Sequence, residues 1–228
     1  MDLTPAQRAI IERTINVVET GKPDGNYAAI VRYADGPHNI RQITYGRSQT
    51  TEYGNLRKLV QAYVAANGLY SHELAMYADR VGSEPLTYDN NFIALLKNAG
   101  KNDPIMRKTQ DQFFDEVYFR PAMQWADDHQ FKLPLSALVI YDSFIHSGQI
   151  LWFLRQRFAE SPPSLGGDEK KWVKAYVDVR HDWLANHSRK ILQKTIYRTQ
   201  AFKDQIAKNN WNLSQLPLMM NGVAVTPG

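Results

Sequence analysis

The stretch VVETGKPDGNYAAIVRY, residues 17–33, takes the chain from the end of a helix through a turn into a strand. Upstream of Gly21, apolar residues recur at helical spacing, and the glycine marks where that helix stops. Downstream of the turn, residues 27–33 and 40–46 are rich in β-branched and aromatic residues, with turn residues between them. The sequence therefore predicts a helix that ends at Glu19, followed by a β-hairpin.

The remainder of the chain has almost entirely helical periodicity. Helices are predicted over residues 55–66, 69–82, 89–98, 103–130 with an interruption at Pro121, 135–158 with a break near Ser147 and Gly148, 168–193 and 199–208. No other segment is a good strand candidate, so the predicted fold class is α+β, mainly α, with one small antiparallel sheet near the N-terminus. A chain of 228 residues is long enough for a single domain, residues 1–228, with two lobes around a substrate cleft.

Composition excludes several classes of partner and cofactor. The 27 basic and 23 acidic residues leave a net charge of +4 without any block of basic residues, so we expect no nucleic-acid partner. No run of about 18 apolar residues is present to span a membrane. The chain has no cysteine, its histidines lack the HExxH spacing, and it has no glycine-rich phosphate loop. We therefore expect no metal, nucleotide or flavin cofactor.

Two carboxylates stand at the ends of the predicted elements, on either side of one hairpin arm. Glu19 ends the first helix, where the helix dipole disfavours an anion, and Asp35 follows the first strand. One protonated and one ionised carboxyl group are the acid and base that glycoside hydrolysis requires. Spacing alone favours an ordinary pair of surface carboxylates, so the pair needs further support.

A third acidic residue lies in an unusual place. Asp142 interrupts the nearly continuous apolar segment ALVIYDSFIH, residues 137–146, and a buried carboxylate is costly unless a cation and hydrogen bonds satisfy it. Arg180 and Arg198 are the candidate partners. A structural salt bridge between helices is the favoured interpretation, and it is compatible with a network that also tunes the proton affinity of Glu19. We expect a structural partner for His146, because no Ser/His/Asp arrangement surrounds it.

Several segments together resemble one known enzyme family. ETGKPDGNYAAIVRYADG (19–36) and ITYGRSQTTEYGNLRKLV (43–60) are similar to the catalytic region of the glycoside hydrolase family 46 chitosanases. Three later segments are similar to helices of that family, in the same order: DEVYFRPA (115–122), VIYDSFIHSG (139–148) and YVDVRHDWL (176–184). The resemblance implies a lysozyme-like fold of two lobes, mainly helical, with a small sheet and a long central helix.

The resemblance also implies roles for individual residues. Glu19 would be the general acid, Asp35 the general base, and Thr44 would help to hold the attacking water. The charged network behind the acid would consist of Asp142, Arg180 and Arg198. Apart from the resemblance, Tyr27 and Tyr45 are expected to contact the substrate, because aromatic faces suit the apolar faces of sugar rings. Arg47, Asn55 and His146 are the other expected contacts.

Two departures bear on these roles. The link DGPHNIRQIT between Asp35 and Thr44 is longer than the link of the family, so Asp24 and Glu52 remain alternative bases. Asn55 stands where some members have an aspartate that contacts the cationic sugar. The basic balance of the chain also discourages a polycationic substrate at long range.

The leading functional hypothesis is an endo-acting, inverting chitosanase that cleaves the β-1,4 bonds of chitosan. The alternatives are a peptidoglycan-cleaving muramidase or effector on the same scaffold, and a non-catalytic glycan-binding module. We expect a monomer whose partner is a polysaccharide, located outside the cell. Charged residues among the first fifteen positions rule out a signal peptide there, so a signal has been removed or export uses another route.

Overall fold

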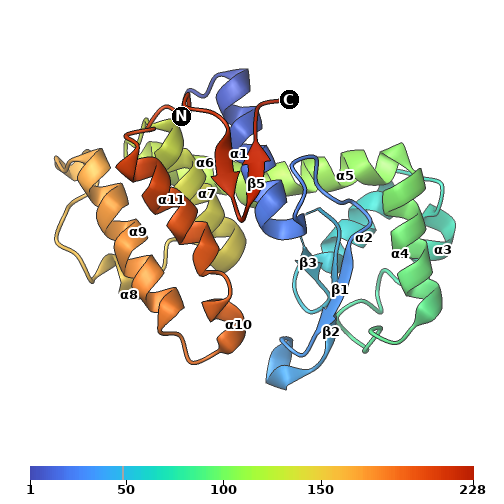
Figure 1. The fold of residues 1–228 in the computed structure, drawn as a ribbon. Coiled ribbons are helices and arrows are strands. Elements are labelled where there is room, and N and C mark those ends of the chain that lie inside the picture. Colours follow the sequence, from blue (N-terminus) through green and yellow to red (C-terminus); the bar gives the residue numbers. More distant parts are fainter. Residues whose placement is uncertain (48) are drawn as a thin grey trace. The chain divides into compact units, whose positions relative to one another are not determined.

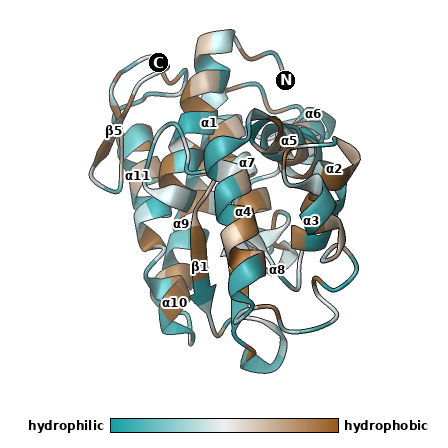
Figure 2. Cartoon of the chain, turned by 90° about the vertical axis from the view of Figure 1, so that its right-hand side faces the viewer, coloured by the Kyte–Doolittle hydropathy of each residue, from teal (hydrophilic) through white to brown (hydrophobic). Residues whose placement is uncertain are grey.

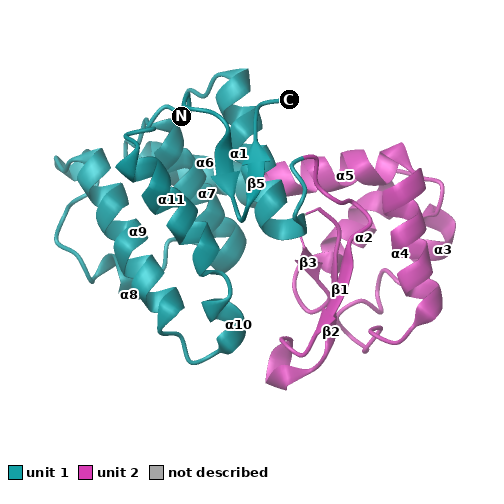
Figure 3. Cartoon of the chain, in the orientation of Figure 1, with its two compact units in different colours: residues 1–23, 117–228 teal, residues 24–116 magenta. Residues whose placement is uncertain are grey.

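The computed structural model describes residues 1–47 and 49–228, which form two compact units (Figure 3). Unit 1 comprises Met1–Pro23 and Val117–Gly228, and unit 2 comprises Asp24–Glu116. The two sheets of the described residues are small and antiparallel, and helices make up most of the remaining regular structure (Figure 1). The predicted α+β class, mainly α, is confirmed. No helix in the described part of the chain is long and apolar enough to cross a membrane.

Unit 1 is a helical bundle with a short hairpin. Its main helices are α1 (Pro5–Thr20), α6 (Arg120–Asp128), α7 (Pro134–Ser147), α9 (Glu169–Ala185) and α11 (Ile196–Ala207). Shorter elements are α8 (Trp152–Arg155), α10 (Lys190–Gln193), a 3₁₀ turn at Pro163–Leu165, and the hairpin strands β4 (Leu218–Met220) and β5 (Val223–Val225). A π-helical segment, Asp115–Phe119, carries the chain from unit 2 into α6.

The core of unit 1 is built around α7. Every residue of this helix from Pro134 to Ser143 is buried, and α1, α6, α9 and α11 all pack against it (Figure 1). This explains why the helix is apolar on all sides, since a helix that is hydrophobic all round belongs in the interior. Asp142 is therefore carried into the interior by the helix that organises the unit.

The described residues of unit 2 contain a three-stranded sheet, with strand order β1-β2-β3, four α-helices and a 3₁₀ turn at Pro37–Asn39. β1 (Ile30–Tyr33) pairs with β2 (Gln42–Tyr45), which pairs in turn with the two-residue strand β3 (Thr50–Thr51). The helices are α2 (Leu56–Ala65), α3 (Ser71–Ala75), α4 (Asn90–Asn102) and α5 (Pro104–Phe114). Hydrophobic and hydrophilic residues alternate along α4, and the start of β1 is hydrophobic (Figure 2). The predicted hairpin is confirmed, with shorter strands than expected.

Three predictions of secondary structure were wrong. The sequence MNGVAV contains an Asn-Gly turn at 221–222, and both residues have positive φ, which joins β4 to β5 in a hairpin that was not predicted. The segment 69–82 is helical only in Ser71–Ala75, and the segment predicted as one helix over 168–193 is divided into α9 and α10. In the two helical segments a local turn interrupts a pattern that is otherwise compatible with a helix.

A close approach in unit 2 requires glycine at position 100. A Cβ atom there would lie 2.2 Å from the carbonyl oxygen of Tyr27 and 2.8 Å from the hydroxyl oxygen of Tyr45. Neither neighbour can yield easily, because one is backbone and the other is fully buried. The residue thus sets how closely α4 packs against the segment that leads into β1.

We expect Gly100→Ala to lower the free energy of unfolding by about 1 to 3 kcal/mol, although alanine is the better helix former. The measurement is urea denaturation, with Asn98→Ala in the exposed face of the same helix as the control. The control should be neutral or slightly stabilising. A Gly100→Ala protein as stable as wild type would contradict the close packing.

Candidate active site

The last turn of α1 presents Glu19, and several hydrogen bonds hold that turn. Gly21 adopts a left-handed conformation and its N–H donates to the carbonyl of Val17 at 2.9 Å. The hydroxyl of Tyr197 donates to the carbonyl of Val18 at 3.0 Å. The position of Glu19 is therefore fixed by its own helix and by the start of α11.

The carboxylate of Glu19 is paired with an arginine in a largely buried position. Nη2 of Arg198 donates to Oε1 of Glu19 at 2.5 Å, and the two side chains are 6% and 10% exposed, respectively. Burial raises the pKa of Glu19; Arg198 opposes this shift, and the charge of Asp142 adds to it. Glu19 thus holds its proton to higher pH than an exposed glutamate, as a general acid must.

Asp142 lies between two arginines, as the sequence predicted. Its Oδ1 accepts a hydrogen bond from Nη1 of Arg198 at 2.9 Å, and its Oδ2 is 2.7 Å from Nη1 of Arg180. All three side chains are buried. Burial opposes the ionisation of Asp142, but Arg198 and Arg180 outweigh it and lower its pKa. One ionic network therefore joins α7, α9, α11 and the end of α1.

His146 has the structural partner that the sequence led us to expect. Its Nδ1 is 3.3 Å from Nη2 of Arg180, and because arginine only donates, Nδ1 accepts and the proton of the ring lies on Nε2. Burial, together with the charges of Arg198 and Arg180, lowers the pKa of His146 to about 3. The ring is therefore neutral at physiological pH. It remains half-buried at the end of α7.

Asp35 lies in unit 2, two residues after the end of β1. Its Oδ1 accepts a hydrogen bond from Nε2 of Gln42, the first residue of β2, at 3.0 Å. The loop that carries Asp35 closes through a hydrogen bond from the N–H of Gly36 to the carbonyl of Ile40. Asp35 is half-buried, in contrast to Asp24, the first alternative base, which is exposed.

Thr44 and Glu52 are both buried in the sheet of unit 2. Thr44 is 7% exposed and pairs with Val31 across β1 and β2. Glu52 is fully buried, and its carboxylate accepts hydrogen bonds from the N–H groups of Ile43 and Leu86 and from the hydroxyl of Thr87. Glu52 is therefore a structural carboxylate that ties the sheet to the loop before α4, which removes the second alternative base.

Among the expected substrate contacts, the prediction for Tyr45 was wrong. It is fully buried, its hydroxyl donates to the carbonyl of Leu96 at 2.7 Å, and burial raises its pKa. A ring enclosed in this way cannot stack on a sugar. All four residues of β2 are classed as buried, and Tyr45 is the most enclosed position that was assigned to the substrate.

Tyr27 and Arg47 are brought together by a residue that the sequence did not single out. The hydroxyl of Tyr27 donates to Oδ1 of Asp111 at 2.9 Å, and the same oxygen forms a short ion pair with Arg47. Burial and the charge of Asp111 raise the pKa of Tyr27 to about 12. Asn55, the remaining predicted contact, is half-buried at the start of α2.

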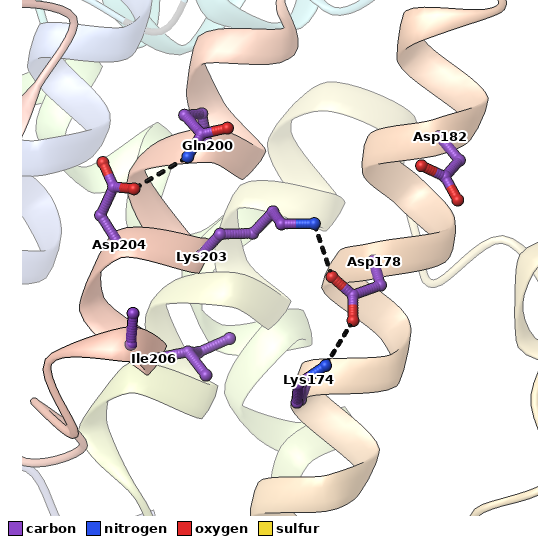
Figure 4. Close-up of a pocket in the computed structure, with 8 residues that line it drawn as sticks. Lys174, Asp178, Asp182, Gln200, Lys203, Asp204 and Ile206 are labelled. Carbon is purple, nitrogen blue, oxygen red and sulfur yellow. Dashed lines mark hydrogen bonds and ion pairs between the residues drawn. The ribbon is translucent and has the colours of Figure 1, made fainter.

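A pocket of about 730 Å³ lies elsewhere, between α9 and α11 of unit 1 (Figure 4). Asp178 at its centre bridges Lys174 and Lys203, with oxygen to nitrogen distances of 2.8 and 2.7 Å. These three side chains are partly exposed and paired with one another, and none of the predicted site residues lines the pocket. The pocket is therefore a solvated groove between two helices. Within residues 1–47 and 49–228, no group of three or more acidic or histidine side chains could hold a metal ion.

Two functional candidates had no clear signal in the sequence. Asp111 lies on an amphipathic helix where a carboxylate is ordinary, and Gln42 is one polar residue in a short strand that follows Arg41. Both are recognised only through their side-chain partners in the folded protein. Asp111 contacts Tyr27 and Arg47, and Gln42 contacts Asp35.

Comparison with known proteins shows similarity to one family of glycosyl hydrolases. The sequence profile described as "Glycosyl hydrolase family 46" matches residues 14–218. A protein named Chitosanase, from Bacillus subtilis (strain 168), is 30% identical over 230 residues, covering 93% of this chain and 81% of the relative.

Two solved chitosanase structures are similar in fold to this chain. A family 46 chitosanase from Gynuella sunshinyii, in complex with chitotetraose, has a TM-score of 0.84 and 21% identity, with 99% of this chain and 98% of that one covered. A glutamate-to-alanine variant of the chitosanase from Bacillus subtilis MY002, complexed with six GlcN units, has a TM-score of 0.83 and 25% identity. There the coverage is 99% of this chain and 100% of the other.

The raised pKa of Glu19 predicts how stability depends on pH. The folded protein binds this proton more tightly than the unfolded chain. The stability that protonated Glu19 contributes to the fold is therefore fully present below the ordinary pKa of 4.5, and it is lost as pH rises through the folded pKa. Glu19→Gln cannot ionise. Relative to wild type, it should gain roughly 1.4 kcal/mol of stability for each unit of the shift as pH rises through this range.

The measurement is urea denaturation of both proteins at a pH below 4.5 and at about pH 8. Glu12→Gln is the control, because it removes a carboxylate from the same helix that is 32% exposed and pairs with Arg8. If Glu19→Gln and wild type differ in free energy of unfolding by the same amount at both pH values, the pKa of Glu19 is not raised in the folded protein.

Proposed function

We propose, on the premise that this chain belongs to glycosyl hydrolase family 46, that it is an endo-acting, inverting chitosanase that cleaves the β-1,4 bonds of chitosan. The observation that carries the proposal is the environment of Glu19, a carboxyl group with a raised pKa held at a helix end by a buried arginine. The name of the curated relative, Chitosanase, supports the choice of polymer. Membership of the family makes the protein a glycosidase.

Glu19 is the proposed general acid. Arg198 donates to its Oε1, so the acidic proton is placed on Oε2, the oxygen that would give it to the glycosidic oxygen of the substrate. As the bond between the anomeric carbon and that oxygen breaks, the leaving sugar takes the proton and Glu19 becomes a carboxylate. The neighbouring Arg198 then stabilises the charge that develops on Glu19.

Asp35 is the proposed general base. Its Oδ1 is engaged by Gln42, which assigns to Oδ2 the removal of a proton from the attacking water. Thr44, on β2, is proposed to hold that water. The water attacks the anomeric carbon from the face opposite the leaving group, so its oxygen ends in the inverted configuration.

Peptidoglycan is the second candidate substrate. The net charge of +4 suits an anionic cell wall better than a polycation at long range. The chemistry of Glu19 and Asp35 would be the same for both polymers. Either substrate is too large to reach an enzyme inside the cell, so we propose an extracellular location, and we expect a monomer that acts on a polysaccharide chain.

The first test is the release of reducing ends from soluble chitosan and, in parallel, from purified peptidoglycan. We expect wild type to cleave chitosan into oligosaccharides of mixed length, as an endo-acting enzyme does. Glu19→Gln and Asp35→Asn should each lose roughly 10²- to 10⁴-fold in rate, because each removes one partner of acid–base catalysis. Both variants should keep the circular dichroism spectrum of wild type.

The alternatives give different results in the same assay. Cleavage of peptidoglycan alone would keep the site and change the substrate. Binding of chito-oligosaccharides without release of reducing ends would indicate a glycan-binding module, and near-normal turnover by Glu19→Gln would remove Glu19 from its role.

The stereochemistry of the product gives a second prediction. Proton NMR of fresh hydrolysate should detect the α-anomer first, because inversion at a β-linked carbon produces it. In a crystal structure with a bound oligosaccharide, the carboxyl groups of Glu19 and Asp35 should be about 6.5 to 9.5 Å apart or more, which leaves room for water. An initial β-anomer, or a separation of about 5 Å, would point to retention instead.

A further inference from the structure

We propose that Gln42 is a positioning residue for Asp35, which it holds in one orientation through the side-chain amide. The inference rests on the proposed function, in which Asp35 is the general base. It concerns residues of unit 2 alone, and its argument depends on the hydrogen bonds around one buried amide.

The side chain of Gln42 is enclosed and has two hydrogen-bond partners. It is 5% exposed at the start of β2, where its backbone pairs with Tyr33 of β1. Its Nε2 donates to Oδ1 of Asp35 at 3.0 Å, and its Oε1 accepts from the N–H of Tyr53 at 3.2 Å. The amide therefore connects the backbone after β3 to the carboxylate after β1.

The direction of the amide is fixed by Tyr53. A backbone N–H can only donate, so the amide oxygen of Gln42 must face it, and the NH₂ group must face Asp35. Since an amide has no charge, what Gln42 gives Asp35 is a directed hydrogen bond rather than an ion pair.

The loop around Asp35 shows why such a support is needed. His38 and Asn39 both have positive φ, and a Cβ atom on Gly36 would lie 2.8 Å from the carbonyl oxygen of Ile40. These features fix the backbone after Asp35 but leave its side-chain torsions undetermined. Within the described part of the chain, the hydrogen bond from Gln42 is the one that orients the Asp35 carboxylate.

Orientation of the base is expected to affect the chemical step more than binding. A catalytic group must be held within about 0.5 Å of its productive position, and a misplacement of about 1 Å can cost roughly 100-fold in rate. Gln42 is too enclosed to be a main contact for the polymer. Its loss should therefore lower kcat and leave KM nearly unchanged.

The experiment compares Gln42→Met and Gln42→Asn, each in the wild-type and the Asp35→Asn background. Methionine has a similar volume and cannot donate, while asparagine keeps the amide but is too short to reach both Tyr53 and Asp35. Gln110→Met is the matched control. Gln110 is fully buried, and it accepts from the N–H of Arg47 and donates to the hydroxyl of Tyr45, so it supports the same strand without contacting Asp35.

In the wild-type background, we expect both Gln42 variants to lose about 10- to 100-fold in kcat on chitosan, with KM within about twofold of wild type. In the Asp35→Asn background they should cause no further loss, because Gln42 acts through the carboxylate. The control should give the same relative change in both backgrounds, whatever it does to the melting temperature.

Two results would overturn the inference, and they are distinguishable. If Asp35→Asn is inactive while folded Gln42 variants keep the wild-type kcat, or if their losses simply add to that of Asp35→Asn, Gln42 does not position the base. If Asp35→Asn itself turns over at the wild-type rate, the proposed base is wrong and the role of Gln42 falls with it.

Discussion

One buried carboxylate, Asp142, determines how the charges of unit 1 are arranged. Two guanidinium groups meet it in the interior, and removal of the carboxylate would leave both of them buried without a counter-charge. Arg198 contacts Asp142 through Nη1 and Glu19 through Nη2, so the position of the arginine beside the proposed acid is set by α7. The network carries two positive charges and one fixed negative charge, and Glu19 supplies the second negative charge only when it ionises. Burial resists that ionisation and Arg198 favours it, and the raised pKa of Glu19 means that burial prevails.

The two proposed catalytic carboxyl groups lie in opposite environments. Glu19 is largely buried and meets a full positive charge, whereas Asp35 is half-buried on a loop and meets a neutral amide. The environment of Glu19 favours the protonated form that a general acid needs. The arginine has a further use, since it is already in place when Glu19 gives up its proton and becomes charged.

The sequence predicted the part of the site that depends on periodicity. Asp142 interrupted an apolar helix, and that pattern alone required cationic partners, which proved to be Arg180 and Arg198. It did not predict contacts that depend on the path of a loop. Gln42 meets Asp35 because the chain between them turns back through two residues with positive φ, and no spacing rule encodes that turn. Tyr45 was assigned to the substrate because aromatic residues suit sugars, but β2 is covered on both faces. The Asn-Gly pair at 221–222 is a strong local hairpin signal, and it encodes the turn that joins β4 to β5.

The basic balance of the chain has less bearing on its substrate than it first suggests. At physiological ionic strength, exposed charges are screened beyond about 8 Å, so a net charge of +4 distributed over 228 residues acts weakly on a polymer at a distance. Several positive charges are also already committed, since Arg180 and Arg198 are buried against Asp142 and Arg47 is paired with Asp111. Asp111 itself remains 46% exposed beside Tyr27. Selection between a cationic and an anionic glycan therefore depends on the side chains within hydrogen-bonding reach of each sugar, and the total charge of the chain affects mainly the rate of encounter.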